Sequence, residues 1–358
     1  MSNRGYIGRM KPRLVNQRVG EPSLIRAAVR HAVRVLAACS ATIFCGGCLF
    51  HPLQLPPRPP EPAPKNLCRQ PDAAKQSSGF QAIPTQPDPN RGKKRDYQEL
   101  TLTNSLEANG RTLQIDYYLP NLTPAAGEAP QKSPCILILP IMGGTQYDLE
   151  RFFGRSFAKR GFATAILHRP DLKSEVHQLE AIDGLLLRSL QDAQSAIDWF
   201  ETRPEIDPGR IGLFGVSLGA IRATLVLGVD PRVRAAVLGL VGGDLPYILT
   251  HSREKGLVRE RDKLLAAQHL SLEQAEARLR ASITCDPLTV APAVDPSRVL
   301  MVIAAFDKSI PASKGWELRR KLGNPATVQL FSGHYSSVIY APYLRWKTGN
   351  FFEQHLGK

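Results

Sequence analysis

A serine lies in the middle of a short glycine-rich turn that could make it a nucleophile. Residues 215–219 read Gly-Val-Ser-Leu-Gly, after an apolar run and before an apolar helical pattern. This G-x-S-x-G spacing is typical of a nucleophile elbow, in which the serine sits on a strained turn and the glycines let neighbouring elements approach. Ser217 is therefore the candidate nucleophile. The alternative is a structural turn whose serine does no chemistry.

Two further residues could activate Ser217. A serine hydroxyl is a poor nucleophile until a base removes its proton, and a carboxylate commonly orients that base. Asp307 directly follows the apolar run 298–306, and His334 closely follows the run 326–331. The order Ser, Asp, His, with each residue just after a predicted strand, indicates a catalytic triad.

Apolar runs alternate with helical patterns over residues 97–358 and define the elements that must position these side chains. Alternation on both sides of Asn109 and Gly110 predicts a β-hairpin. Continuous apolar runs predict buried parallel strands at residues 135–140, 162–168, 210–214, 233–241, 298–306 and 326–331. The expected fold class is α/β, a mostly parallel central sheet with helices on both faces and active groups at the carboxyl ends of the strands.

The segment that ends in the serine turn resembles a known superfamily. Residues 206–219 read Ile-Asp-Pro-Gly-Arg-Ile-Gly-Leu-Phe-Gly-Val-Ser-Leu-Gly. They are similar to the elbow region of α/β-hydrolases of the dienelactone-hydrolase-like, acetyl-esterase-like and prolyl-oligopeptidase-like branches, and the loop 307–311 is also typical of them. The resemblance covers roughly residues 97–358 and implies the α/β-hydrolase fold.

The resemblance also assigns roles to the candidate residues. It makes Ser217 the nucleophile, His334 the general base and acid, and Asp307 the group that orients and stabilises the imidazolium. Asp244, which follows the apolar run 233–241, is the alternative acid because some hydrolases of this superfamily carry the carboxylate there.

Backbone N–H groups would stabilise the oxyanion of a tetrahedral intermediate. Leu218, which follows the candidate nucleophile, would supply one N–H at the start of a helix. Many relatives have His-Gly after the third strand, where this chain has Pro140 and Ile141. The second donor is therefore placed by alignment at Met142, after the altered pair.

Residues 245–297 form an insertion between two predicted strands. Their pattern is helical and charged, without a strand signal. We expect a small helical cap over the site that shapes the acyl or alcohol pocket. Its charged runs between residues 253 and 263 are typical of a solvated helix face.

The N-terminal region has the plan of a secretory signal. Residues 1–34 are basic, and residues 35–50 are an uncharged stretch of 16 residues, which is short for a membrane-spanning helix. The stretch ends in Cys-Gly-Gly-Cys at Cys48, which resembles the lipobox of bacterial lipoprotein precursors, except that Cys45 replaces the usual aliphatic residue. The resemblance implies lipidation of Cys48. A second lipobox-like sequence ends at Cys39, but its preceding segment is charged.

Composition then divides the chain into a signal segment, residues 1–50, a linker, residues 51–96, and a hydrolase domain, residues 97–358. The linker is rich in proline and polar residues, which favours an extended, flexible tether. We expect export to a bacterial cell envelope with a possible membrane tether through the N-terminus. A cytoplasmic location is the alternative.

Charge distribution argues against a nucleic-acid partner. Residues 1–96 hold 16 Lys and Arg against 5 Asp and Glu, whereas residues 97–358 hold 30 against 27. The domain is therefore nearly balanced and lacks a nucleic-acid-binding motif. The scattered cysteines predict neither a disulfide framework nor a zinc site. We expect no metal and no organic cofactor.

These features predict a serine hydrolase that cleaves a small-molecule carboxylic ester through an acyl-enzyme on Ser217. A serine peptidase or amidase of the prolyl-oligopeptidase type is one alternative. A catalytically weak envelope binding protein that uses the hydrolase fold is another. The sequence names neither the ester nor the oligomeric state.

Overall fold

The computed structural model describes residues 56–61, 81–83, 97–106, 111–121, 131–143, 146–169 and 178–357. The chain divides into two compact units, residues 1–47 and 48–358, and every described residue belongs to the second. The predicted signal segment, including Cys48, lies outside the described residues.

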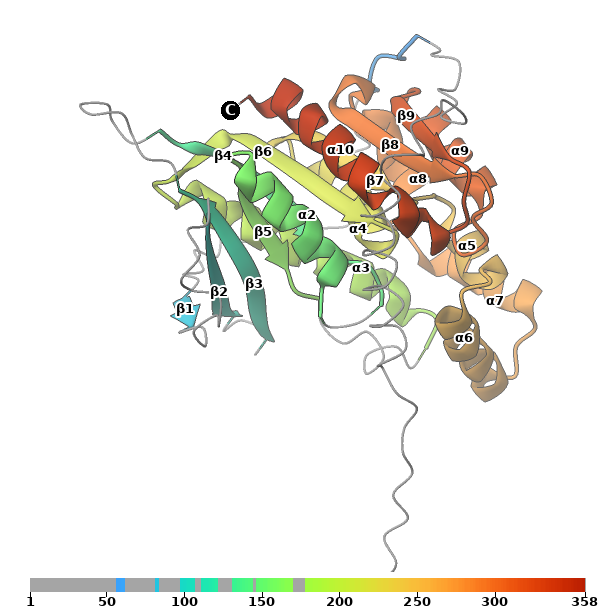
Figure 1. The fold of residues 1–358 in the computed structure, drawn as a ribbon. Coiled ribbons are helices and arrows are strands. Elements are labelled where there is room, and N and C mark those ends of the chain that lie inside the picture. Colours follow the sequence, from blue (N-terminus) through green and yellow to red (C-terminus); the bar gives the residue numbers. More distant parts are fainter. Residues whose placement is uncertain are drawn as a thin grey trace, which may run out of the picture. The chain divides into compact units, whose positions relative to one another are not determined.

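The described residues contribute nine strands to one sheet, in the order β1-β2-β3-β5-β4-β6-β7-β8-β9 (Figure 1). The strands are β1 Gln81–Ile83, β2 Tyr97–Leu106, β3 Arg111–Pro120, β4 Ser133–Leu139, β5 Ala163–Leu167, β6 Ile206–Val216, β7 Val233–Gly239, β8 Val299–Ala304 and β9 Ala326–Leu330. Strands β4 to β9 run parallel, while β1, β2 and β3 are antiparallel to their neighbours. The predicted mostly parallel sheet is confirmed.

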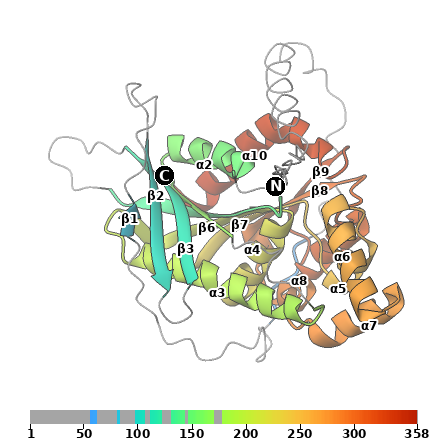
Figure 2. The same cartoon turned by 90° about the horizontal axis from the view of Figure 1, so that it is seen from below.

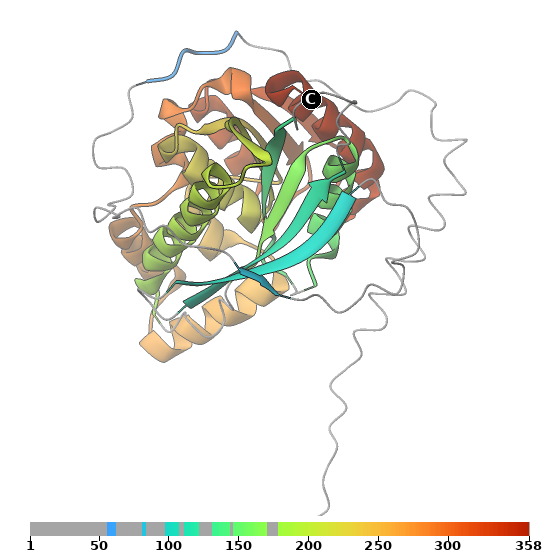
Figure 3. The ribbon, with the colours of Figure 1, turned by 90° about the vertical axis from the view of Figure 1, so that its left-hand side faces the viewer.

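Strands β2 and β3 pair along their whole length, with Leu106 opposite Arg111 at the end. This is the predicted hairpin, and its turn, with Asn109 and Gly110, lies outside the described residues. The edge of the sheet that carries the hairpin faces the viewer in Figure 3.

Helices cover both faces of the sheet. They are α2 Asp148–Lys159 and α10 Ala341–Leu356 on one face, and α3 Ala181–Glu201, α4 Leu218–Val229 and α9 Ala312–Lys321 on the other (Figure 2). Strand β4 has apolar side chains on both faces, which explains why helices cover both. On one face Cys135, Leu137 and Leu139 pack toward α3 and α4, and on the other Ile136 and Ile138 pack toward α2 and α10. Side chains alternate along a strand, so an uninterrupted apolar run fills two cores.

Two pieces of the predicted linker contact the domain. Strand β1 pairs with the outer edge of β2, and the N–H groups of Arg58 and Glu61 donate to the carbonyls of Gly323 and Pro292. An exposed strand edge offers unpaired N–H and C=O groups to any extended segment. At these points the chain therefore differs from the free tether that its composition predicts.

The predicted insertion, residues 245–297, contains helices and no strand, as its pattern predicts, and its last turn ends at Arg298. The elements are α5 Leu245–His251, α6 Lys255–Gln268, α7 Leu272–Ser282, α8 Pro287–Val290 and the short 3-10 turns η3 Ala291–Ala293 and η4 Pro296–Arg298. The insertion has a small apolar core, in which Ala275 and Leu279 pack with Leu179. Within the described part of the chain, no helix is long and apolar enough to cross a membrane.

Candidate active site

The turn between β6 and α4 holds Ser217 in a conformation that non-glycine residues rarely adopt. Its φ is 56° and its ψ is −123°. Backbone strain of this kind concentrates at functional sites. The Ser217 N–H donates to the carbonyl of Gly239 at 2.8 Å, which fixes the turn to the end of β7.

Gly215 and Gly219 are required by close packing around this turn. A Cβ on Gly215 would lie 2.4 Å from the backbone carbon of Gly219. A Cβ on Gly219 would lie 2.0 Å from the carbonyl oxygen of Leu139, at the end of β4. Any larger residue would push α4 away from the sheet, as the G-x-S-x-G pattern predicts.

The structure brings Ser217, His334 and Asp307 together from the ends of three strands. His334 Nε2 lies 3.0 Å from Ser217 Oγ, and His334 Nδ1 lies 2.6 Å from Asp307 Oδ2. An ionised carboxylate can only accept hydrogen bonds, so it places the imidazole proton on Nδ1. Nε2 is then left as the acceptor for the serine hydroxyl.

Asp307 is fixed by the backbone around it. Its Oδ1 accepts hydrogen bonds from the N–H groups of Ser309 and Ile310 at 2.8 and 2.9 Å. Only 2% of its side chain is exposed, compared with 11% for His334. A carboxylate held in this way keeps the imidazole in one orientation.

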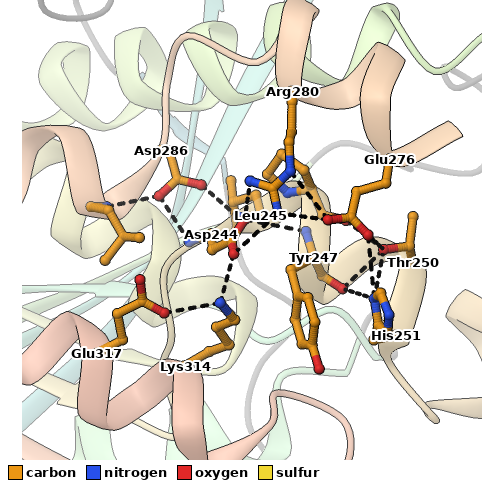
Figure 4. A network of polar contacts seen from close by, with 12 residues as sticks. Asp244, Leu245, Tyr247, Thr250, His251, Glu276, Arg280, Asp286, Lys314 and Glu317 are labelled. Carbon is orange, nitrogen blue, oxygen red and sulfur yellow. Dashed lines mark hydrogen bonds and ion pairs between the residues drawn. The ribbon is translucent and has the colours of Figure 1, made fainter. Parts of the chain in front are cut away.

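Asp244, the alternative acid, lies in a different network, shown in Figure 4. Its carboxylate contacts Arg280 at 2.9 Å and Lys314 at 2.6 Å, and it accepts from the N–H of Tyr247 at the start of α5. Burial raises the pKa of Asp244, but the hydrogen bonds from Lys314 and Arg280 outweigh that effect and hold it below its ordinary value. The structure therefore places Asp307, not Asp244, beside His334.

The two predicted oxyanion donors lie on segments that meet at the elbow. Leu218 is the first residue of α4, where backbone N–H groups have no partner within the helix. Met142 lies in the loop after β4. A Cβ on Gly219 would be only 3.0 Å from the carbonyl of Pro140, so that loop passes directly over the start of α4.

Two charged residues that the sequence analysis did not single out hold this loop. Glu150 Oε1 accepts from the N–H of Ile141 at 2.9 Å. Arg169 Nε donates to the carbonyl of Ile141 at 3.0 Å, and its Nη2 donates to that of Met142. Burial raises the pKa of Glu150, although the hydrogen bond from Ile141 opposes the effect. Arg169 directly follows the predicted strand 162–168. Asp307 was selected because it directly follows a predicted strand, and the same criterion would have selected Arg169.

Solved structures of hydrolases share this architecture. An acetyl xylan esterase from Paenibacillus sp. R4 matches with a TM-score of 0.59 and 18% identity, over 78% of this chain and 89% of that one. Acetyl xylan esterase 1 from Thermoanaerobacterium sp. JW/SL YS485 matches with a TM-score of 0.52 and 14% identity, over 80% and 94%. The chain has the α/β-hydrolase fold. The acylaminoacyl peptidase of Pyrococcus horikoshii matches with a TM-score of 0.55 and 16% identity, over 74% of this chain and 43% of that one.

Sequence comparison adds one relative. Thiohydrolase apmlB of Arthrinium phaeospermum is 33% identical over 84 residues, which are 24% of this chain. The match spans 27% of the thiohydrolase, so the likeness is local. No protein-family model matches the chain.

The helical insertion contacts the two loops that carry Asp307 and His334. Tyr335 Oη donates to Glu254 Oε1 at 2.9 Å, and the N–H of Arg253 donates to the carbonyl of Lys308 at 2.9 Å. Tyr335 follows His334 in sequence. The junction between α5 and α6 therefore lies next to the candidate site, a proximity that sequence patterns do not reveal.

One buried cation lies on the helix that begins at the elbow. Arg222 is 3% exposed, and its three guanidinium nitrogens make no hydrogen bond to any residue that the structure describes. Burial lowers the pKa of Arg222 to about 10; Asp192 attracts its charge and Arg169 repels it. Among the residues that the structure describes, no group of His, Cys, Asp or Glu side chains is arranged to hold a metal ion.

Proposed function

We propose that the chain is a serine hydrolase that cleaves carboxylic esters. The observation that carries the proposal is the chain of contacts from Ser217 through His334 to Asp307. It starts at a strained turn whose two glycines tolerate no side chain. A hydrogen-bonded nucleophile, base and orienting carboxylate is the arrangement that acyl transfer requires.

In the proposed reaction, Ser217 Oγ attacks the ester carbonyl while its proton passes to His334 Nε2. Asp307 stabilises the imidazolium, and the N–H groups of Leu218 and Met142 bind the oxyanion. The alcohol leaves with the proton from Nε2, which gives an acyl-enzyme. Water then loses a proton to His334 and attacks the acyl carbon. The imidazolium returns the proton to Ser217 Oγ as the acid is released.

The reaction class also covers thioesters, because a thiol leaves by the same step. Two of the structural neighbours are named acetyl xylan esterases, and the sequence relative is named a thiohydrolase. A substrate panel should therefore contain p-nitrophenyl esters of increasing acyl length, acetylated sugars and an acyl thioester. Aminoacyl p-nitroanilides test the peptidase alternative.

A fluorophosphonate probe tests the proposal directly. We expect covalent labelling of the folded protein that disappears in Ser217→Ala, together with loss of ester hydrolysis. Ser332→Ala is a suitable control because Ser332 is a buried serine that contacts Ser337, not His334. Folded protein that neither reacts with the probe nor turns over any ester would favour the binding-protein alternative instead. Faster cleavage of anilides than of esters would favour the peptidase.

We also propose export and lipidation of Cys48. The basic segment, the apolar stretch and the lipobox-like sequence support the proposal. Cys285 is disulfide-bonded, and disulfides persist mainly in oxidising compartments. After expression in a bacterial host, the protein should stay with membranes through a sodium carbonate wash, which removes peripherally bound proteins, and Cys48→Ala should not. Carbonate-resistant membrane retention of Cys48→Ala would contradict lipidation, and a full-length protein in the soluble cytoplasmic fraction would contradict export.

A further inference from the structure

Exposed apolar side chains gather on one part of the described surface. In the described part of the chain eight large hydrophobic residues are exposed, and one of them, Leu272, lies apart on α7, in the insertion. The other seven form what we call the apolar face: Phe152, Phe306, Phe331, Tyr335, Val338, Ile339 and Trp346. They come from α2, from the loops after β8 and β9, from the 3-10 turn η5 Ser336–Tyr340, and from α10.

Two contacts join neighbouring parts of the apolar face. The rings of Phe306 and Phe331 lie 6.2 Å apart. The Arg345 guanidinium, on α10, lies 5.3 Å from the ring of Phe152, on α2. Four of the seven, Tyr335, Val338, Ile339 and Trp346, lie within twelve residues after His334. Single exposed hydrophobic residues are ordinary, whereas several on neighbouring elements indicate an interaction site.

The chemistry of the apolar face fits a lipid surface. Val338, Ile339 and Trp346 are 54%, 53% and 54% exposed. Aliphatic side chains would enter the acyl region, and tryptophan and tyrosine favour the boundary between lipid and water. Residues 331–352 contain Arg345 and Lys347 and no Asp or Glu. Cations beside an apolar surface favour anionic headgroups.

We propose that the apolar face docks the catalytic domain onto an anionic phospholipid bilayer. This contact is separate from any tether at the N-terminus and does not depend on esterase activity. Because Tyr335 directly follows His334, docking would turn the candidate active site toward the bilayer. The protein would then meet esters dissolved in the membrane.

Tryptophan fluorescence of the full chain can test this face specifically. Residues 1–96 contain no tryptophan, so the N-terminal segment cannot produce the signal. Of the three tryptophans, Trp199 is 3% exposed and Trp316 packs against the core, whereas Trp346 is 54% exposed. With vesicles of phosphatidylglycerol and phosphatidylcholine, we expect emission to shift to shorter wavelength and to be quenched by brominated acyl chains. The Trp346→Phe variant should lose most of that quenching.

Paired surface variants test which side chains bind. Vesicle binding can be measured by the quenching of Trp346. The double variant Val338→Ser and Ile339→Ser should bind vesicles roughly tenfold more weakly or worse, because two aliphatic side chains no longer enter the lipid. Leu272→Ser, which removes an exposed leucine elsewhere, should leave binding unchanged. Thermal unfolding of each variant checks that the fold is retained.

Two results would overturn the proposal. One is vesicle-bound protein whose Trp346 emission is neither shifted nor quenched, because binding would then use another part of the chain. The other is a dimer, seen by light scattering without vesicles, in which Trp346 is shielded from iodide. That result would assign the apolar face to a second copy of the chain.

Discussion

Tyr335 donates a hydrogen bond to Glu254 at 2.9 Å and so joins the loop that carries His334 to the start of α6. Glu254 also caps α6 by accepting from the N–H of Leu257. One carboxylate thus orders the insertion and holds the residue next to the candidate base. The position of the imidazole is therefore coupled to the docking of the insertion.

Removal of the Tyr335 hydroxyl should loosen this coupling. We expect Tyr335→Phe to lower kcat on a short soluble ester by roughly threefold to tenfold, because about 1 kcal/mol of hydrogen bonding is lost beside the base. Tyr343→Phe is a matched control, since the structure shows no hydrogen bond from the Tyr343 hydroxyl to a described residue. Equal kcat values for both variants and the wild type would show that the contact does not position His334.

The stability that the Tyr335–Glu254 hydrogen bond contributes depends on pH in a defined way. Burial and then the hydrogen bond to Glu254 raise the pKa of Tyr335 to about 12, from 10. A phenol whose folded pKa is raised contributes stability that is complete below its ordinary pKa and lost as the pH rises through the folded value. The stability difference between the wild type and Tyr335→Phe should therefore be constant from pH 6 to 9, as measured by urea unfolding. A difference that changed within that range would contradict this account.

Asparagine substitutions distinguish the two acids. Asp307→Asn should lower kcat by on the order of 10³ to 10⁴, because an amide no longer fixes the imidazole proton on Nδ1. Asp244→Asn should change kcat by less than about tenfold, since its partners are Arg280 and Lys314. Steady-state kinetics on one ester decides between them. Loss of turnover in Asp244→Asn but not in Asp307→Asn would reverse the assignment.

Asp244 should instead matter for acid stability. Its pKa is lowered in the folded protein, so its contribution is present above the unfolded pKa and is lost as the pH falls through the folded value. Asp244→Asn should therefore be less stable than the wild type at pH 7, and the two should converge as the pH falls well below the ordinary pKa of an aspartate. Denaturant unfolding at a series of pH values measures the difference. Curves that stay parallel down to pH 2 would show that the carboxylate charge does not act in this way.

The parts of the site predicted from sequence were those that follow from local pattern. Ser217 was identified by the two glycines that its turn requires. Asp307 and His334 were identified because parallel strands bring their carboxyl ends to one edge. The choice between Asp307 and Asp244 needed the structure, since both follow apolar strands and only one carboxylate reaches the imidazole.

The supporting contacts depend on tertiary packing that carries no local signal. Glu150 looks like any acidic residue in the first turn of a helix, and its burial against Ile141 appears only when α2 packs on the sheet. Tyr335 and Glu254 are 81 residues apart and meet through the docking of the insertion. Strand β1 pairs with β2 through backbone groups, so composition alone predicted a linker.

Glu150 should act on catalysis through the loop that holds Met142. Glu150→Ala leaves the N–H of Ile141 without its acceptor, so we expect kcat to fall by about tenfold with little change in KM. Glu150→Gln keeps an acceptor oxygen and should recover most of the rate. Steady-state kinetics of the two variants makes the comparison. If the glutamine and alanine variants are equally impaired, the buried charge matters rather than the hydrogen bond.

Arg222 should lower the stability of the fold. A buried guanidinium without hydrogen bonds is costly, and an apolar side chain of similar length can replace it. We expect Arg222→Met to raise the free energy of unfolding by on the order of 1–4 kcal/mol at pH 7. Arg222→Lys retains the buried charge and should give no such gain.

The size of the Arg222 effect also depends on pH. A cation whose folded pKa is lowered destabilises the protein fully below that pKa, and the effect is relieved as the pH rises through it. Since the pKa of Arg222 is lowered to about 10, the advantage of Arg222→Met should be constant from pH 6 to 8 and shrink above pH 10. Urea unfolding across this range measures it. A methionine variant less stable than the wild type at pH 7 would mean that the guanidinium is stabilised in solution by a partner such as water or an anion.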